Sequence, residues 1–139
     1  MADPAAVLAD PAFREVVDPA EPVCVIFGVL GLMPARQARE VVAGYADLLA
    51  PGSLLVVSCA RVDDEALWKR LSEAYTAADI YNHSPGGVEG FLAGLELIRP
   101  GLVAARNWRG GWHDVPATPP GPAYALGAAA RKPLPGTAG

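Results

Sequence analysis

Two apolar runs, separated by a segment of helical periodicity, constrain the fold of this chain more than any other feature. Residues 23–30 and 53–59 are apolar almost throughout and do not alternate with polar residues. Each run therefore predicts a strand that is covered on both faces of a parallel sheet. Between them, apolar residues recur at helical spacing from Pro34 until Gly52, which predicts an amphipathic helix. Strand, helix and strand at this length predict a βαβ unit with parallel strands and a right-handed crossover.

Composition and charge exclude several classes of protein. Hydrophobic residues make up 52% of the 139 residues, which predicts a folded domain. The net charge of −4 argues against nucleic acid as a partner, because phosphate binding needs clustered Lys and Arg. The sequence contains no run of about 18 apolar residues, so it predicts no membrane span. The first residues lack the basic and apolar parts of a secretory signal, so we expect a cytoplasmic protein with no membrane partner.

The two cysteines, Cys24 and Cys59, each lie inside an apolar run. A free thiol in such a run behaves as a small core residue, so we expect both to be buried and reduced. No spacing of Cys and His is typical of zinc, and we expect no metal.

The other elements follow from periodicity and from Gly and Pro. We expect helices over residues 4–17, 64–78 and 86–93, strands over 95–98 and 102–105, a loop over 109–122 and a last strand over 123–130. Asp63 or Asp64 is expected to cap the helix at 64–78. Its apolar residues are expected on the buried side, and they are Leu67, Trp68, Leu71 and Tyr75. The last strand is expected to pair antiparallel with the one before it. One domain over 1–132 and a disordered tail over 133–139 complete the prediction.

Five stretches of the chain resemble a known family of enzymes: 3–11, 22–34, 48–58, 91–103 with Trp108-Arg109, and 123–133. They resemble the C-terminal half of an S-adenosylmethionine-dependent methyltransferase, in a family of high-GC bacteria formerly catalogued as a domain of unknown function. The resemblance implies the fold class: α/β, a partial Rossmann-like class I methyltransferase sheet of strands four to seven, the last strand antiparallel, with helices on the faces. It implies S-adenosyl-L-methionine as cofactor.

The resemblance does not extend to the family's N-terminal half, which carries the glycine-rich turn and the acidic residue for the ribose hydroxyls. We therefore expect a truncated fragment that is inactive alone. A truncated gene, a misplaced start codon and a split enzyme with a separate N-terminal half remain open. The family has a histidine after its fourth strand, where this sequence has Gly31.

The end of the first apolar run is the predicted cofactor rim, because ligands of open α/β sheets bind beyond the carboxyl ends of the strands. The rim residues are Phe27, Gly28, Val29, Leu30 and Gly31. Alternatively, the two glycines only permit a tight exit turn.

Tyr81 and His83 are the candidate catalytic residues, since a histidine is able to act as a general base near neutral pH. No carboxylate is placed by the sequence to orient His83, and a solvated loop histidine is the alternative that we favour. Trp108 either stacks on a planar ligand or packs a strand against a helix.

A second functional hypothesis is a non-catalytic interaction module. In the intact fold the strand at 23–30 pairs with the first strand. Without that neighbour it presents an open apolar edge, which recruits another chain. A homodimer or docking onto a separate N-terminal half is expected.

Overall fold

The computed structural model describes residues 3–108 and 121–136 of the chain. The helices are α1 (Pro4–Ala9), α2 (Pro11–Arg14), α3 (Ala35–Leu48), α4 (Glu65–Ala74) and α5 (Pro85–Gly90), with 3-10 turns η1 (Leu30–Leu32) and η2 (Ala105–Asn107). The strands are β1 (Cys24–Phe27), β2 (Leu54–Val62), β3 (Glu96–Leu97), β4 (Val103–Ala104) and β5 (Ala123–Arg131).

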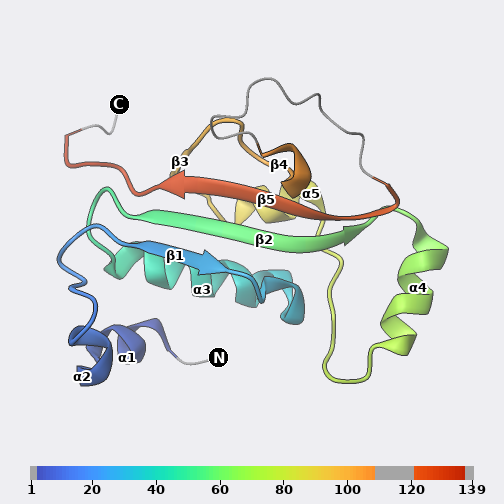
Figure 1. Cartoon of the computed structure of the whole chain (residues 1–139), viewed down its shortest axis with the longest axis horizontal. Helices are drawn as coiled ribbons and strands as arrows, with labels where there is room; N and C mark the ends of the chain where they lie inside the picture. The colour runs from blue at the N-terminus through green and yellow to red at the C-terminus, as the bar shows by residue number, and fades with distance from the viewer. Residues whose placement is uncertain (1–2, 109–120, 137–139) are drawn as a thin grey trace.

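One mixed sheet organises these elements (Figure 1), and its described strands lie in the order β1-β2-β5-β3, with β4 also paired to β5. β1 and β2 are parallel, as the βαβ prediction requires, while β5 is antiparallel to β2, β3 and β4. The last strand therefore pairs with the strands before it, as predicted, and also enters the sheet beside β2. This arrangement confirms an α/β sheet whose last strand is antiparallel.

Helices α3 and α5 lie behind the sheet in Figure 1 and cover one of its faces. The side chains of that face form the core, and the fully buried ones include Val42 of α3, Leu55 and Val57 of β2, and Val88 of α5. Small residues of β5, among them Ala128 and Ala130, complete the same cluster. Burial on β2 alternates along the strand because the core lies on this one side.

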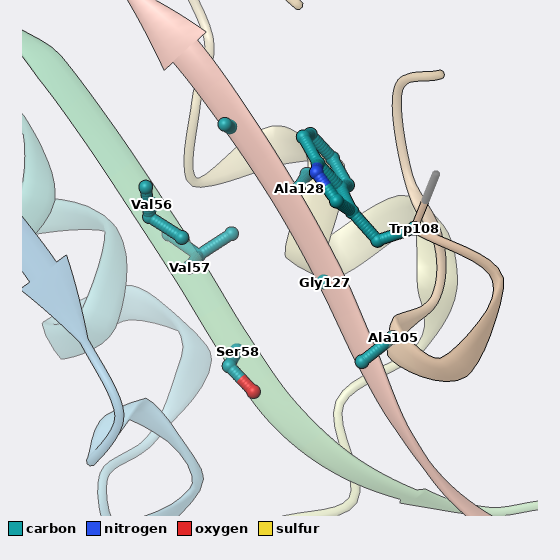
Figure 2. Close-up of a pocket in the computed structure, with 8 residues that line it drawn as sticks. Val56, Val57, Ser58, Ala105, Trp108, Gly127 and Ala128 are labelled. Carbon is teal, nitrogen blue, oxygen red and sulfur yellow. The ribbon is translucent and has the colours of Figure 1, made fainter. Parts of the chain in front are cut away.

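The opposite face of the sheet is more open, which corrects the prediction that both faces of the apolar runs are covered. Ile26 is 71% exposed, and Cys24, predicted to be a core thiol, is exposed as well. Cys59 points to the helical side and is buried, as predicted. The cause is the position of the helices: α3 and α5 cover the other face, whereas η2 and Trp108 lie on the open face near β5 rather than β1 (Figure 2).

Several predicted boundaries are wrong for local reasons. The helix predicted over 4–17 is divided into α1 and α2, because Asp10 precedes a proline and adopts an extended backbone. The Asp10 carboxylate then accepts hydrogen bonds from the N–H groups of Ala12 and Phe13 and caps α2. The strand predicted over 23–30 ends at Phe27, and the strand predicted over 53–59 continues to Val62.

The remaining predicted elements are present but shorter, except for the last strand. The helices at 64–78 and 86–93 are reduced to α4 and α5, and the two middle strands have two residues each. Asp64 caps α4, as proposed for it, by accepting a hydrogen bond of 2.8 Å from the N–H of Leu67. Of the predicted loop, residues 109–120 lie outside the described residues, as do residues 137–139 of the predicted tail.

The start of β2 is fastened to the end of β5. The Gly52 N–H donates to the carbonyl of Lys132 (2.9 Å), and the Lys132 N–H donates to the carbonyl of Ser53 (2.8 Å). The Lys132 ammonium donates to the carbonyl groups of Asp47 and Leu49, at 3.1 and 2.8 Å, where α3 ends. A cation at this position satisfies carbonyl groups that lack partners within the helix.

Gly52 and Gly28 should respond in opposite ways to alanine. Gly52 has a φ of +87°, which disfavours a Cβ, whereas Gly28 has no positive φ and its added Cβ would meet nothing within 4 Å. We expect Gly52→Ala to lower the free energy of unfolding by about 1–2 kcal/mol. Gly28→Ala should leave it within roughly 0.5 kcal/mol or raise it. Urea unfolding followed by circular dichroism measures both, and equal losses in the two variants would contradict this account.

Candidate functional site

The unequal lengths of β1 and β2 create the candidate site. Their pairing ends with Phe27 opposite Val57, and β2 continues to Val62 without a partner on that side among the described strands. A pocket of about 370 Å³ lies beside this free edge. It is lined by Gly28, Gly31, Leu32, Ser58, Cys59, Ala60, Val62, Trp68, Leu71, Tyr75, Ile80 and Tyr81. The pocket thus lies at the carboxyl ends of two parallel strands, where α/β sheets bind ligands.

The predicted cofactor rim is divided between this pocket and the core. Gly28 and Gly31 line the pocket. Phe27 and Leu30 are buried, and the Phe27 ring packs edge-to-face on Tyr45 at a centroid distance of 5.5 Å. Val29 is exposed outside the lining. The structure therefore brings the two glycines of the predicted rim to one cavity.

The two rim glycines do not serve a left-handed turn, since neither has a positive φ. A Cβ added to Gly31 would lie 3.9 Å from the carbonyl oxygen of Tyr81, and one added to Gly28 would meet open space. What the missing side chains provide is room beyond the end of β1. A role of this room in holding a cofactor stays a prediction.

His83 is buried, with 6% of its surface exposed, so the prediction of a solvated loop histidine is wrong. Its Nε2 lies 2.9 Å from the carbonyl oxygen of Leu30, and its ring meets Phe91 edge-to-face at 5.1 Å. A carbonyl oxygen only accepts, so Nε2 carries the proton in this contact. His83 is outside the pocket lining and supports Leu30, where the chain leaves β1.

Tyr81, the other candidate catalytic residue, does line the pocket. Its ring is stacked on the His83 ring at a centroid distance of 6.2 Å, and its N–H donates to the carbonyl of Gly31 at 2.8 Å. The sequence placed Gly31 and Tyr81 fifty positions apart without linking them. The structure joins them at one edge of the cavity.

A network of polar groups holds the segment around Tyr81 against β2. The Asn82 side chain exchanges two hydrogen bonds with the main chain of Val62, at 3.0 and 2.8 Å, and so continues the pairing where β1 is absent. The Arg61 guanidinium donates to the carbonyl groups of Asn82 and His83 and forms an ion pair of 2.8 Å with Asp63. Asp63 in turn accepts a hydrogen bond of 2.8 Å from the Tyr124 hydroxyl.

Helix α4 provides the wall of the pocket and not a part of the core, contrary to the prediction for its apolar stripe. Leu71 is 42% exposed and Tyr75 is 46% exposed, and α4 has no buried residue. Together with Trp68 they face the pocket. Sequence periodicity identified the stripe correctly but assigned it to packing.

The pocket is uncharged. Among the described residues that line it, none is Asp, Glu, Lys, Arg or His. Burial raises the pKa of the Cys59 thiol to about 11, so this thiol is also neutral at physiological pH. Within residues 3–108 and 121–136, no group of three or more His, Cys, Asp or Glu is placed to hold a metal ion. In the same ranges no helix has the length and hydropathy needed to cross a membrane.

A second, smaller cavity of about 290 Å³ lies on the open face of the sheet. Figure 2 shows Trp108 beside β5, with Ala105 below it and Val56 and Ser58 on the neighbouring β2. Trp108 is 37% exposed, and its indole lies over Gly127 and Ala128 on the strand that enters the middle of the sheet. It therefore packs on a strand, while its stacking on a planar ligand stays a prediction.

The polar network around Asp63 determines the pH range in which this carboxyl titrates. Hydrogen bonds from Arg61 and then from Tyr124 lower the pKa of this carboxyl below its usual 3.8. Its contribution to stability is therefore present above that value and lost as the pH falls through the lowered pKa. In carboxyl-carbon NMR titrations we expect Tyr124→Phe to raise the midpoint of Asp63. Tyr75→Phe, which removes a tyrosine hydroxyl elsewhere, should leave the midpoint unchanged, and a shift in both variants would exclude the direct hydrogen bond as its cause.

Two solved structures match the chain closely in fold. A candidate methyltransferase from Thermobifida fusca YX superimposes with a TM-score of 0.79 and 27% identity, over 95% of this chain and 51% of that one. A DUF574 family protein from Streptomyces avermitilis MA-4680 superimposes with a TM-score of 0.75 and 26% identity, over 94% of this chain and 52% of that one. The chain thus spans about half the length of these proteins. No curated protein sequence matches it.

The family comparison covers nearly the whole sequence, with residues 1–133 matching the S-adenosyl methyltransferase family. This match includes both strands of the βαβ unit, the pocket at their carboxyl ends and the antiparallel strand β5. The chain therefore belongs to the S-adenosyl methyltransferase family.

Proposed function

We propose that this chain forms the C-terminal half of an S-adenosylmethionine-dependent methyltransferase domain, that its strand-end pocket receives the methyl acceptor, and that it is inactive alone. The observation that carries the proposal is the pocket at the carboxyl ends of β1 and β2 in a chain of this family. The related structures support the assignment to one half of a domain, because this chain spans about half the length of each. The other half of the fold completes the enzyme, in the same polypeptide or in a separate one.

The pocket leaves room for part of the cofactor but lacks partners for its charged and strongly polar groups. S-adenosylmethionine carries a ribose with two hydroxyls and an amino-acid end with both charges, which need charged or strongly polar partners. Gly28 and Gly31 leave room for close approach, but the described lining offers no charged side chain. These residues therefore do not form a complete cofactor site, and we derive no catalytic step through the cofactor.

An uncharged pocket is compatible with methyl transfer. Holding two reactants in line supplies a large part of the rate in such reactions, so few acid or base groups are required. Tyr81 is the candidate to contact the acceptor, because its ring lies at the pocket. His83 acts through Leu30 and Tyr81 and is a positioning residue in this proposal.

The cofactor test uses this chain alone and together with the other half of the fold. We expect calorimetric titration of the chain with S-adenosylmethionine to give no binding tighter than about 1 mM, since most polar partners of the cofactor are absent. Adding the other half of the fold, taken from the T. fusca relative, should restore micromolar binding and methyl transfer. Gly28→Val in the restored complex should weaken binding, while Gly86→Val, which lies outside the pocket lining and also has open space around an added Cβ, should not. Micromolar binding by the isolated chain would refute the proposal that the cofactor site needs the other half of the fold.

A second candidate function is an interaction module that dimerises, or docks onto the other half, through residues 23–30. The specific observation is that β1 is a terminal strand of the described sheet and is paired with β2 alone. Ile26 and Cys24 on this strand are exposed. An open strand edge with apolar side chains favours pairing with another chain.

The two free cysteines also support the cytoplasm as the proposed location of the protein.

The cysteines provide the test of this surface. Iodoacetamide should modify exposed Cys24 well before Cys59, whose thiol is buried and has a pKa of about 11. If β1 pairs with another chain, alkylation of Cys24 should slow as the protein concentration rises, or when the other half is added. Mass spectrometry measures the modification and light scattering measures the mass. A monomer whose Cys24 stays equally reactive in both conditions would rule out the docking role.

A further inference from the structure

The free edge of β2 carries main-chain groups that point into the pocket. The Leu54 N–H donates to the carbonyl of Val23 on β1, and the main chain of Val62 bonds Asn82 on the same side. Because main-chain groups alternate along a strand, Ala60 must also direct its N–H and carbonyl to this side. β1 has ended there, since its last pair joins Phe27 to Val57. Ala60 is exposed, and within the described residues neither group has a hydrogen-bond partner.

Flat and apolar side chains line the pocket beside this edge. Trp68 comes from α4 and Tyr75 is the residue that caps its C-terminal end, while Ile80 and Tyr81 come from the segment that follows. Gly28 and Gly31 keep the opposite end open. A cavity of about 370 Å³ with such walls lies within the range that holds small organic molecules. Its aromatic lining favours a ring system over a flexible chain.

We propose that this pocket binds an uncharged, planar aromatic molecule that carries a donor and an acceptor on one edge, paired with the main chain of Ala60. The rings of Trp68, Tyr75 and Tyr81 contact its faces and rim. If the proposed methyltransferase function holds, molecules of this class are the methyl acceptors, and that identification alone rests on the proposed function.

The absence of charge from the described lining selects against ions. A carboxylate or ammonium group moved from water into this pocket would lose hydration without gaining a partner of opposite charge. A neutral ring loses little hydration and gains contact with apolar walls. The donor and acceptor of Ala60 then contribute orientation, because a bound molecule replaces the next strand of the sheet.

Three bicyclic probes separate these contributions. 2-Quinolinone is neutral and has adjacent N–H and carbonyl groups, 1-methyl-2-quinolinone lacks the donor, and 2-naphthoate is an anion. Amide NMR spectra of the whole chain report both affinity and location. We expect 2-quinolinone to bind with a dissociation constant below about 1 mM. The methylated probe should bind about fivefold more weakly and the anion about tenfold more weakly. The largest shifts should fall on Ala60, Gly31 and Tyr81.

A pair of lysine substitutions tests the charge argument. Leu71 lies at the pocket and Leu48 lies on α3 away from it, and the two are similarly exposed, at 42% and 48%. Leu71→Lys should weaken 2-quinolinone and strengthen 2-naphthoate, because it places a cation at the rim. Leu48→Lys should leave both affinities unchanged. Unaltered unfolding midpoints in urea show that both variants are folded.

The inference is overturned if 2-naphthoate binds as tightly as 2-quinolinone, if the shifts lie outside the pocket, or if none of the probes binds. These measurements need neither cofactor nor methyl transfer. Binding of 2-quinolinone by a chain that never supports methyl transfer would leave the ligand class standing and remove the acceptor role. Methyl transfer without 2-quinolinone binding would overturn the ligand class and leave the proposed methyltransferase function standing.

Discussion

Nine successive residue pairs join β2 to β5, from Leu54 with Arg131 to Val62 with Ala123, and the remaining structure is arranged around this ladder. It holds β2 extended beyond the point where its other neighbour, β1, has ended. A strand supported on one side and free on the other is what leaves main-chain groups available at the pocket. Without the long antiparallel partner, the last residues of β2 would lose the ladder that fixes their register.

The central βαβ unit was predictable from sequence because its signals are local. Two apolar runs and an intervening helical period define parallel strands and a crossover without knowledge of distant residues. The faces of these strands that helices cover were not predictable, because an apolar run does not show on which face of the sheet a helix will pack. Ile26 is apolar like its neighbours, yet α3 lies on the other side of its strand. The segment-by-segment prediction and the family resemblance both gave an antiparallel last strand, but neither stated that it lies beside β2.

The candidate site depended on long-range contacts and was only partly predicted. Strand-end logic selected Gly28 and Gly31, and both line the pocket. The stripe on α4 has the same spacing whether it meets a core or a cavity, so its exposure needed the structure. His83 illustrates a different limit. A polar residue in a loop sequence is usually solvated, and its burial results from an acceptor at Leu30, fifty-three positions away.

The position of β5 has a consequence for how the domain assembles. It is the last of the described strands to be synthesised, yet it lies in the middle of the sheet between β2 and the pair β3 and β4. Until it arrives, β2 has an open edge on each side of its second half, and β3 and β4 have no partner in the described sheet. Such delayed, non-local pairing slows folding and leaves strand edges open to wrong partners. The nascent chain is therefore most vulnerable to misassociation before residue 131 emerges from the ribosome, a period in which a chaperone would have the greatest effect.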